Sequence, residues 1–328
     1  MSLFRSHPLK ATLTALLLSA GSGQVLAAPS VADLTLKQKI GQLQQMNSDA
    51  KTVAEIPESL KAAVRNGQVG SILNIGSPEV ANELQRIAMT ESAGKIPLIF
   101  ARDVIHGFRT IMPTPLGQAA SWNADLVQAG ARAAAVEASS MGIRWTFAPM
   151  IDISRDSRWG RITESFGEDP YLTSVLTVAS VRGYQGDSLS DPTSIAATAK
   201  HFVGYGAAEG GRDYNVTYIP EPLLHNIYLP PFKAAVDAGV ATIMSAFNDL
   251  NGVPASAHDY AINRVLRGEF GFEGVIVSDW DSVLELIPHG YAQDKQEAAL
   301  RALKAGLDIE MVSTTMQESL PALLDSGK

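Results

Sequence analysis

The run Thr146-Phe147-Ala148-Pro149-Met150-Ile151 is apolar without alternation, and Asp152 follows it directly. A strand with one solvent-exposed face alternates apolar and polar residues. A parallel strand that is covered by helices on both faces is apolar throughout. This run therefore predicts a buried parallel strand, and Asp152 marks its carboxyl end.

Similar runs recur along the chain with helical stretches between them. They are residues 69–73, 96–100, 195–199, 241–244, 274–277 and 306–309. Residues 123–141, 221–238 and 294–304 have the composition and the end signals of helices, with Asn123 as an N-cap and Gly142 just past a helix end. An eighth strand, short or irregular, is expected within residues 104–145, near 109–112. This alternation predicts an α/β fold of the (β/α)8 TIM-barrel type, with a doubly wound sheet as the alternative.

Composition excludes several function classes. The chain has 328 residues, of which 46% are hydrophobic and 18% are charged, so it is not a disordered chain. It has no cysteine, which rules out disulfides, thiolate metal sites and cysteine nucleophiles. The formal charge of −8 argues against nucleic acid as a partner. With six histidines and no His-x-His motif, no metal and no other cofactor is expected.

The first 28 residues have the pattern of a signal peptide. Arg5 and Lys10 precede a short apolar run, and small residues follow it up to Ala27 and Ala28. The apolar run is too short to span a bilayer. We therefore expect cleavage near Ala27 or Ala28, a periplasmic location, one domain over residues 29–328, and no membrane contact after cleavage.

Polar residues gather where the expected strands end. In a barrel, these ends meet at the face that carries the active site. The residues concerned are Asp103, Arg161, Glu164, Lys200, His201, Phe247, Asp279 and Trp280. Carboxylates and cations bind hydroxyl groups while rings cover C–H faces, so this mixture favours a polyhydroxylated ligand.

Each of these residues has a structural alternative. Ser282 and Glu285 have the S-x-x-E spacing of a capping box, which leaves Asp279 free for chemistry. Asp169 before Pro170 is interpreted as an N-cap with proline at the first helical position.

Three other residues are weighed in the same way. Lys200, a lysine buried at a strand end, must be paired or serve chemistry. Glu164 is interpreted as the partner of Arg161, and His106 as a satisfied core histidine.

Four motifs in order resemble a known family. They are Arg158-Trp159-Gly160-Arg161 with the following run 164–170, Lys200-His201-Phe202, residues 210–215, and Ser278-Asp279-Trp280. Together they resemble the N-terminal catalytic barrel of glycoside hydrolase family 3, and within that family the periplasmic bacterial β-glucosidases. The resemblance covers the chain from Leu34 onward.

The resemblance implies a retaining, exo-acting β-glucosidase that releases terminal nonreducing β-D-glucosyl residues from a β-glucoside or gluco-oligosaccharide. Asp279 would be the catalytic nucleophile and would form a covalent glycosyl-enzyme. The residues expected to bind sugar hydroxyls are Asp103, Arg161, Lys200 and His201. Those expected to line the same subsite are Met244, Phe247 and Trp280. Phe247 stands where many relatives have a tyrosine beside the nucleophile.

The acid/base group is the gap in this assignment. The resemblance implies that it comes from a second, C-terminal α/β domain, and the chain stops at Lys328. We therefore expect a truncated form without that domain, or a separate C-terminal domain as partner, with Glu209 and Asp213 as surrogates. Two alternatives stay open, namely a Schiff-base aldolase with Lys200 as nucleophile and a non-catalytic sugar-binding remnant.

Overall fold

The computed structural model describes residues 29–327, so the predicted signal peptide lies outside the described residues. Short parallel strands form two groups. The first has the order β10 (Glu310–Met311), β1 (Gln44–Asn47), β2 (Ser71–Leu73), β3 (Ile99–Arg102) and β4 (Trp145–Thr146). The second has the order β5 (Thr198–Phe202), β6 (Thr242–Ser245) and β9 (Val275–Val277). A small antiparallel pair, β7 (Asp249–Leu250) and β8 (Val253–Pro254), follows β6.

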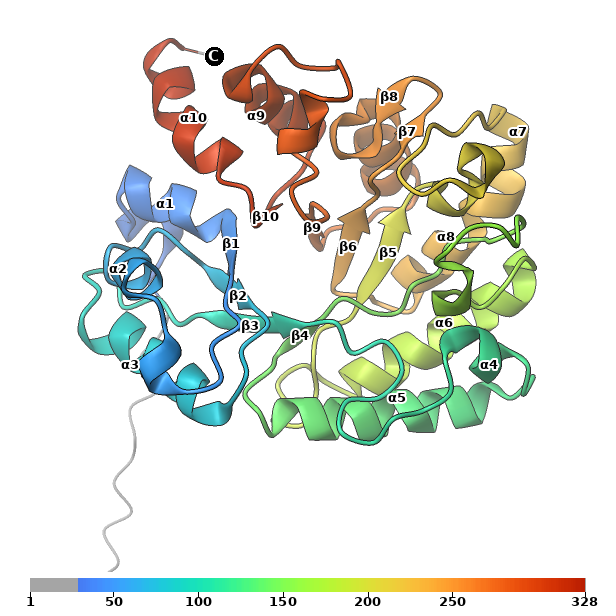
Figure 1. Ribbon diagram of the computed structural model, residues 1–328, viewed down its shortest axis with the longest axis horizontal. Helices are drawn as coiled ribbons and strands as arrows, with labels where there is room; N and C mark the ends of the chain where they lie inside the picture. The colour runs from blue at the N-terminus through green and yellow to red at the C-terminus, as the bar shows by residue number, and fades with distance from the viewer. Residues whose placement is uncertain (1–28, 328) are drawn as a thin grey trace, which may run out of the picture.

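Isolated parallel bridges join the two groups. One pairs Trp145 with Ala196, and the other pairs Val277 with Ile309. The indole Nε1 of Trp145 also donates to the hydroxyls of Thr198 and Thr242, at 2.9 Å in both cases. The strands therefore make one curled parallel sheet (Figure 1).

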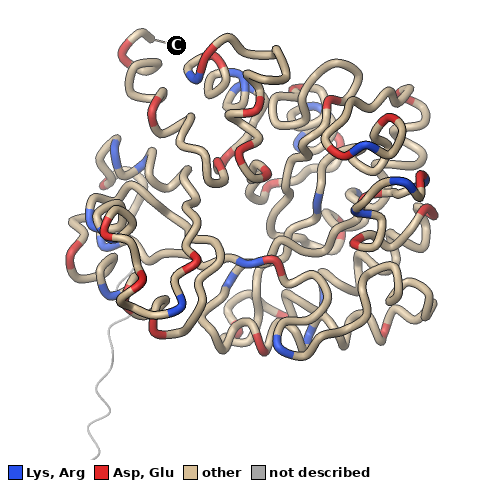
Figure 2. Tube along the Cα trace, in the orientation of Figure 1, with Lys and Arg blue, Asp and Glu red and all other residues tan. Residues whose placement is uncertain are grey.

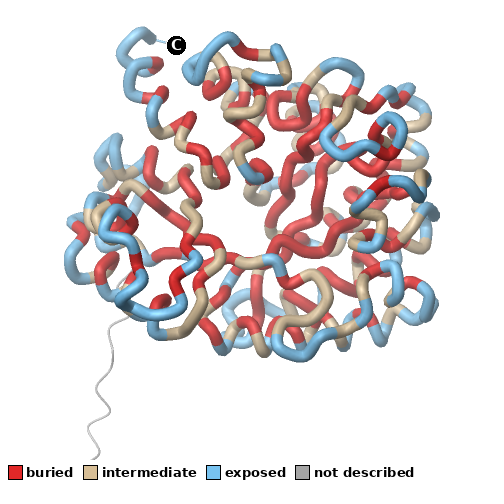
Figure 3. Tube along the Cα trace, in the orientation of Figure 1, coloured by how far each residue is buried: buried red, intermediate tan, exposed pale blue. Residues whose placement is uncertain are grey.

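Helices cover the outside of the curled sheet (Figure 1). In chain order they are α1 (Leu36–Gln42), α2 (Glu58–Arg65), α3 (Pro78–Thr90), α4 (Pro115–Ala119), α5 (Ala124–Ser139), α6 (Pro170–Gln185), α7 (Glu221–Leu223), α8 (Pro230–Asp237), α9 (Lys295–Lys304) and α10 (Thr315–Asp325). Two π-helical segments, Leu224–Tyr228 and Tyr260–Glu269, lie beside them. Figure 3 shows the strands buried and the outer turns of the helices exposed, which is the pattern of strands covered on both faces.

The helix end signals at Asn123, Gly142 and Asp169 are confirmed. The side chain of Asn123 accepts from two backbone N–H groups at the start of α5, and that of Asp169 accepts from Leu172 N at 2.7 Å with Pro170 first in α6. Gly142, just past α5, has a positive φ of 88°. These caps satisfy donors that a helix start otherwise leaves unpaired.

The position predicted for the eighth strand is wrong. Around residues 109–112 there is only an isolated antiparallel bridge between Gly107 and Ile111. The missing strand is β1, whose Gln44 and Gln45 are polar yet 1% and 0% exposed. Their amides donate to the Ser313 carbonyl and the Ser71 hydroxyl, so hydrogen bonds replace the apolar side chains on which the prediction relied.

Several strands lie later in the chain than the apolar runs suggest. The predicted run 195–199 precedes most of β5, so Lys200 and His201 lie inside the strand rather than after it. The predicted run 306–309 likewise ends before β10 begins. The backbone pairing between strands continues through polar residues at their carboxyl ends. A prediction from apolar runs alone leaves these residues out of the strands.

Charges of both signs are mixed over the helices and loops (Figure 2). Within residues 29–327, no helix combines the length and the apolar character needed to cross a bilayer.

Candidate active site

Asp279 lies directly after β9 and is 7% exposed. Its Oδ1 accepts from Trp280 N at 2.7 Å, and its Oδ2 is buried with no hydrogen-bond partner among the described residues. Burial raises the pKa of this carboxyl to about 7, against the opposing charges of Lys200 and Arg161. Buried polar oxygens are rarely left unpaired without a reason, so this oxygen is the first candidate for contact with a substrate.

The predicted capping box is not formed. The Ser282 hydroxyl bonds that of Ser256 at 2.7 Å, and the short 3₁₀ helix Leu284–Leu286 has no side-chain cap. The Oε2 atom of Glu285 has no hydrogen-bond partner among the described residues. The capping argument for Asp279 was therefore wrong, and its availability rests on its own unpaired oxygen.

Lys200 is 4% exposed, and its Nζ lies 2.6 Å from Asp103 Oδ1. Asp103 follows β3, so this ion pair links the carboxyl ends of β3 and β5. Pairing is what the burial of a lysine requires. The side chain of Asp103 is 46% exposed, so the pair also faces outward, where a ligand can reach it.

His201 is held by a residue to which the sequence analysis gave no role. Asp152 Oδ2 accepts from His201 N at 3.0 Å and lies 2.8 Å from His201 Nδ1. The other ring nitrogen, Nε2, lies 3.3 Å from Asp279 Oδ2. Burial lowers the pKa of His201 well below its ordinary value, and burial raises that of Asp152 to about 7. The strand predicted over residues 146–151 is wrong past Thr146, where β4 ends, and only an isolated bridge of Met150 with Lys200 continues the ladder toward Asp152. The apolar run before Asp152 was the available signal.

Arg161 and Glu164 form a two-point ion pair at 2.8 and 3.0 Å, which confirms Glu164 as the partner of Arg161. The guanidinium also lies 5.6 Å from the centre of the Tyr205 ring. Arg158, which the motif places nearby, instead pairs with Asp156 at 2.6 Å and has a 71% exposed side chain. Only the second arginine of the motif therefore belongs to this cluster.

Aromatic rings complete one side of the site. Phe247 is 6% exposed, and its ring centre lies 6.4 Å from that of His201 and 4.2 Å from that of Tyr214. Trp280 is 39% exposed. Tyr214 has a positive φ of 63° and was missed from the sequence, because a loop tyrosine carries no pattern of its own.

Met244 lies in the protein interior, whereas the sequence analysis expected it to line the sugar subsite. It is 1% exposed and packs in an interior cluster with Leu73, Trp145 and Val277. Its expected contact with a sugar stays a prediction.

His106 is satisfied as expected, since its Nδ1 bonds Met112 O at 3.1 Å. The two surrogate acids have other contacts. Asp213 Oδ1 accepts from the buried indole of Trp159 at 2.8 Å, and Glu209 lines an outer groove of about 550 Å³. Among residues 29–327, no group of three or more histidine, aspartate or glutamate side chains is placed to hold a metal ion.

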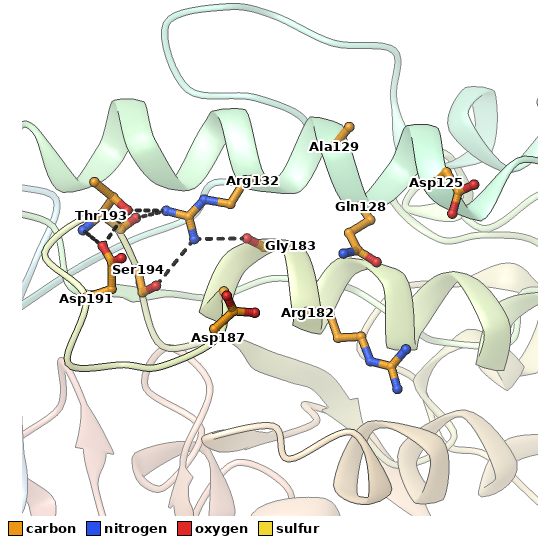
Figure 4. A pocket seen from close by; sticks show the side chains of 11 residues that line it. Asp125, Gln128, Ala129, Arg132, Arg182, Gly183, Asp187, Asp191, Thr193 and Ser194 are labelled. Carbon is orange, nitrogen blue, oxygen red and sulfur yellow. Dashed lines mark hydrogen bonds between the residues drawn. The ribbon is translucent and has the colours of Figure 1, made fainter.

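A separate cavity of about 420 Å³ lies between α5 and α6 (Figure 4). Arg132 donates there to Gly183 O and to the hydroxyls of Thr193 and Ser194. These contacts tie α5 to α6 and to the loop before β5. No residue predicted for the site lines this cavity.

Comparison with known proteins identifies the family. Residues 35–328 match the family described as "Glycosyl hydrolase family 3 N terminal domain". The chain belongs to glycoside hydrolase family 3. Over 295 residues it is 43% identical to the periplasmic β-glucosidase of Salmonella typhimurium, which covers 90% of this chain and 38% of that protein. It is 34% identical to the lysosomal β-glucosidase of Dictyostelium discoideum, over 90% of this chain and 40% of that one.

Solved structures of family 3 enzymes have the same fold. The β-glucosidase of Listeria innocua in complex with glucose superposes with a TM-score of 0.86 at 38% identity, over 90% of this chain and 43% of that one. A variant of that enzyme in complex with laminaribiose gives a TM-score of 0.85 at 39% identity, over 90% of this chain and 42% of that one. The chain thus spans about two fifths of the length of the relatives that it matches.

Proposed function

We propose that this chain is the catalytic barrel of a retaining, exo-acting β-glucosidase with Asp279 as its nucleophile. The observation that carries the proposal is the buried Oδ2 of Asp279, which accepts no hydrogen bond from the described residues. It lies 3.3 Å from His201 Nε2 and near the Lys200–Asp103 pair and Arg161. The match to family 3 and the likeness to β-glucosidases support it. The fold part of the proposal is a closed (β/α)8 barrel, which the parallel bridges between the two strand groups support.

The proposed reaction has two displacements. Asp279 Oδ2 attacks the anomeric carbon of the terminal glucosyl residue, and the bond from that carbon to the leaving oxygen breaks. Water then attacks the same carbon and releases Asp279, so that two inversions give net retention. Lys200 and Arg161 favour the ionised carboxylate that must attack.

The remaining site residues hold the sugar. Asp103, Lys200 and Arg161 offer charge-assisted hydrogen bonds to hydroxyl groups, which are stronger than neutral ones. His201, whose pKa burial lowers, contributes a neutral ring to the same subsite. Phe247 and Trp280 present rings to the apolar C–H faces, and Met244 is proposed to line the same subsite. The sequence left three functions open. Of these, the Schiff-base aldolase is not favoured, because the relatives are glycosidases and Lys200 Nζ is paired with Asp103.

The acid/base residue completes the proposal. A retaining glycosidase needs a second carboxyl about 5–5.5 Å from the nucleophile. Asp213 is engaged by Trp159, and Glu209 faces the outer groove. Since the relatives are more than twice as long as the matched region, we propose that a second domain supplies this group.

Export to the periplasm is proposed for the same chain. The N-terminal pattern and the periplasmic relative support it. N-terminal sequencing of material from the periplasm should begin at Ala28 or Pro29. An intact Met1 in that fraction contradicts the proposal.

The stereochemistry of the product tests the function. Dinitrophenyl β-glucoside has a leaving group that needs no proton, so the chain should react with it. Proton NMR should show β-glucose as the first product, or β-glucosyl azide when azide replaces water as the nucleophile. Asp279→Asn should abolish the reaction, whereas Asp281→Asn, two residues further along the same loop, should retain it. An α-configured first product contradicts the proposal.

A further inference from the structure

Three buried side chains from different parts of the sheet lie in line. Asp152 lies in the segment after β4, just past the isolated parallel bridge of Met150 with Lys200, His201 is in β5, and Asp279 follows β9. Asp152 Oδ2 lies 2.8 Å from His201 Nδ1, and His201 Nε2 lies 3.3 Å from Asp279 Oδ2. The exposed fractions of these side chains are 1%, 1% and 11%.

Hydrogen-bond chemistry decides where the ring proton lies. The Oδ2 atom of Asp152 already accepts the backbone N–H of His201, so a proton on this carboxyl would lie on Oδ1, and Oδ2 is an acceptor in both protonation states. The proton of a neutral ring therefore lies on Nδ1. The Nε2 atom is then a bare acceptor that faces a second acceptor, Oδ2 of Asp279. Two facing acceptors at this distance repel each other unless a proton lies between them.

Other charges near this line are mostly paired with one another. Lys200 is held by Asp103, and Arg161 by Glu164. The charged or titratable groups that act on the line from the surrounding elements are Asp103, Arg161, Glu164, Lys200, Tyr205 and Tyr214. Glu285 and Asp213 act on Tyr214. Because Lys200 and Arg161 are paired with other carboxylates, neither cation fully neutralises Asp279. We therefore expect a proton to be taken up between Asp279 Oδ2 and His201 Nε2.

We propose that Asp152 is a positioning residue, which fixes His201 with the proton on Nδ1 so that bare Nε2 accepts a hydrogen bond from the protonated carboxyl of Asp279. The proposal rests on the assignment of Asp279 as nucleophile. It means that loss of this one proton makes the nucleophile available. The negative charge of Asp152 strengthens the hold on that proton, and so Asp152 sets the pH at which the enzyme becomes active.

The first test is the pH dependence of covalent labelling of Asp279 by a dinitrophenyl 2-deoxy-2-fluoro-β-glucoside. Asp152→Asn keeps an oxygen acceptor for both N–H groups and removes the charge. It should move the acidic limb of the labelling rate to lower pH, by roughly one unit for a charge at this separation. Ser154→Ala is the matched control, because it removes a buried hydroxyl that bonds Ser165 at 2.9 Å and the backbone carbonyl of Asp152 at 3.5 Å, and leaves the Asp152 carboxylate in place. That variant should leave the limb in place.

The second test reads the ring directly and needs no activity. ¹⁵N NMR of the histidine rings, with His201 assigned by its loss in His201→Asn, should show the Nδ1–H form in the unmodified chain and in Asp152→Asn. Asp152→Ala removes the acceptor and should convert the ring to the Nε2–H form.

The two tests separate the proposals. A proton on Nε2 in the unmodified chain, or an acidic limb that Asp152→Asn does not move, overturns the role of Asp152. Absence of labelling at any pH, with the ring in the Nδ1–H form, overturns the proposed function and leaves the positioning of His201 intact.

Discussion

The reactivity proposed for Asp279 depends on its surroundings. Burial raises its pKa to about 7, and the charges of Lys200 and Arg161 limit that rise. The sequence placed this aspartate at a strand end, but the reason offered for its being free, a capping box, does not exist in the structure. Asp152 was seen in the sequence as a strand-end residue and given no role, because its contact with His201 joins positions 49 residues apart.

The pH dependence of glycosylation follows from this carboxyl. The protonated form cannot attack, so the labelling rate should fall about tenfold per pH unit below a pH of about 7 and level off above it. The rate rises with pH because the raised pKa of Asp279 keeps the carboxyl protonated up to a higher pH than an ordinary aspartate. Stopped assays over pH 4.5–8.5 measure it, and a rate that rises toward low pH contradicts it.

Lys200→Met tests the hydroxyl-binding pair. Loss of charge-assisted hydrogen bonds costs about 1.5–3 kcal/mol, which corresponds to about a 10–100-fold fall in kcat/KM for dinitrophenyl β-glucoside. The chain should still fold, because the side chain of Asp103 is 46% exposed and water can replace the lysine. Lys233→Met, which removes a surface lysine paired with Asp237, is the control and should leave kcat/KM unchanged. An unchanged kcat/KM in Lys200→Met removes Lys200 from the site.

At the level of helices and strands, the helix ends could be predicted and one strand could not. Caps are local in sequence, so Asn123 and Asp169 were recognised from their neighbours. The strand β1 contains Gln44 and Gln45, whose burial depends on Ser313 and Ser71, far away in the chain. The boundary of β5 was displaced for a related reason, since buried Lys200 and His201 look like loop residues in a single sequence.

Asp169→Ala should destabilise the protein by about 1 kcal/mol, because it removes the side-chain acceptor for Leu172 N at the start of α6. Urea unfolding followed by circular dichroism measures the change. Asp187→Ala, an exposed aspartate just past the other end of α6, is the matched control and should change the free energy of unfolding by less than about 0.5 kcal/mol. Equal effects of the two changes contradict the capping role.

For the whole molecule, the two strand groups must hold together for the site to exist, since Lys200 and Asp103 come from different groups. Trp145 helps to join them, because its indole on β4 donates to Thr198 on β5 and Thr242 on β6. The sequence indicated that Trp145 is a core residue, which its 3% exposure confirms. The hydrogen bonds of its indole depend on the assembled sheet and were not predictable.

Trp145→Phe should destabilise the protein by about 1–3 kcal/mol, through loss of the indole donor and of ring volume. Trp122→Phe is the control, because Trp122 is 78% exposed, and it should change stability by less than about 0.5 kcal/mol. Urea unfolding again gives both values. A Trp145→Phe protein as stable as the control contradicts the role of Trp145 between the strand groups.

Covalent capture tests the central claim most directly. Incubation with dinitrophenyl 2-deoxy-2-fluoro-β-glucoside should add one fluoroglucosyl group to the intact mass, and peptide mapping should place it on Asp279. The label should be absent from Asp279→Asn and present in Asp281→Asn. A label on any other carboxylate, or no label on a chain that circular dichroism shows to be folded, contradicts the assignment of Asp279 as the nucleophile.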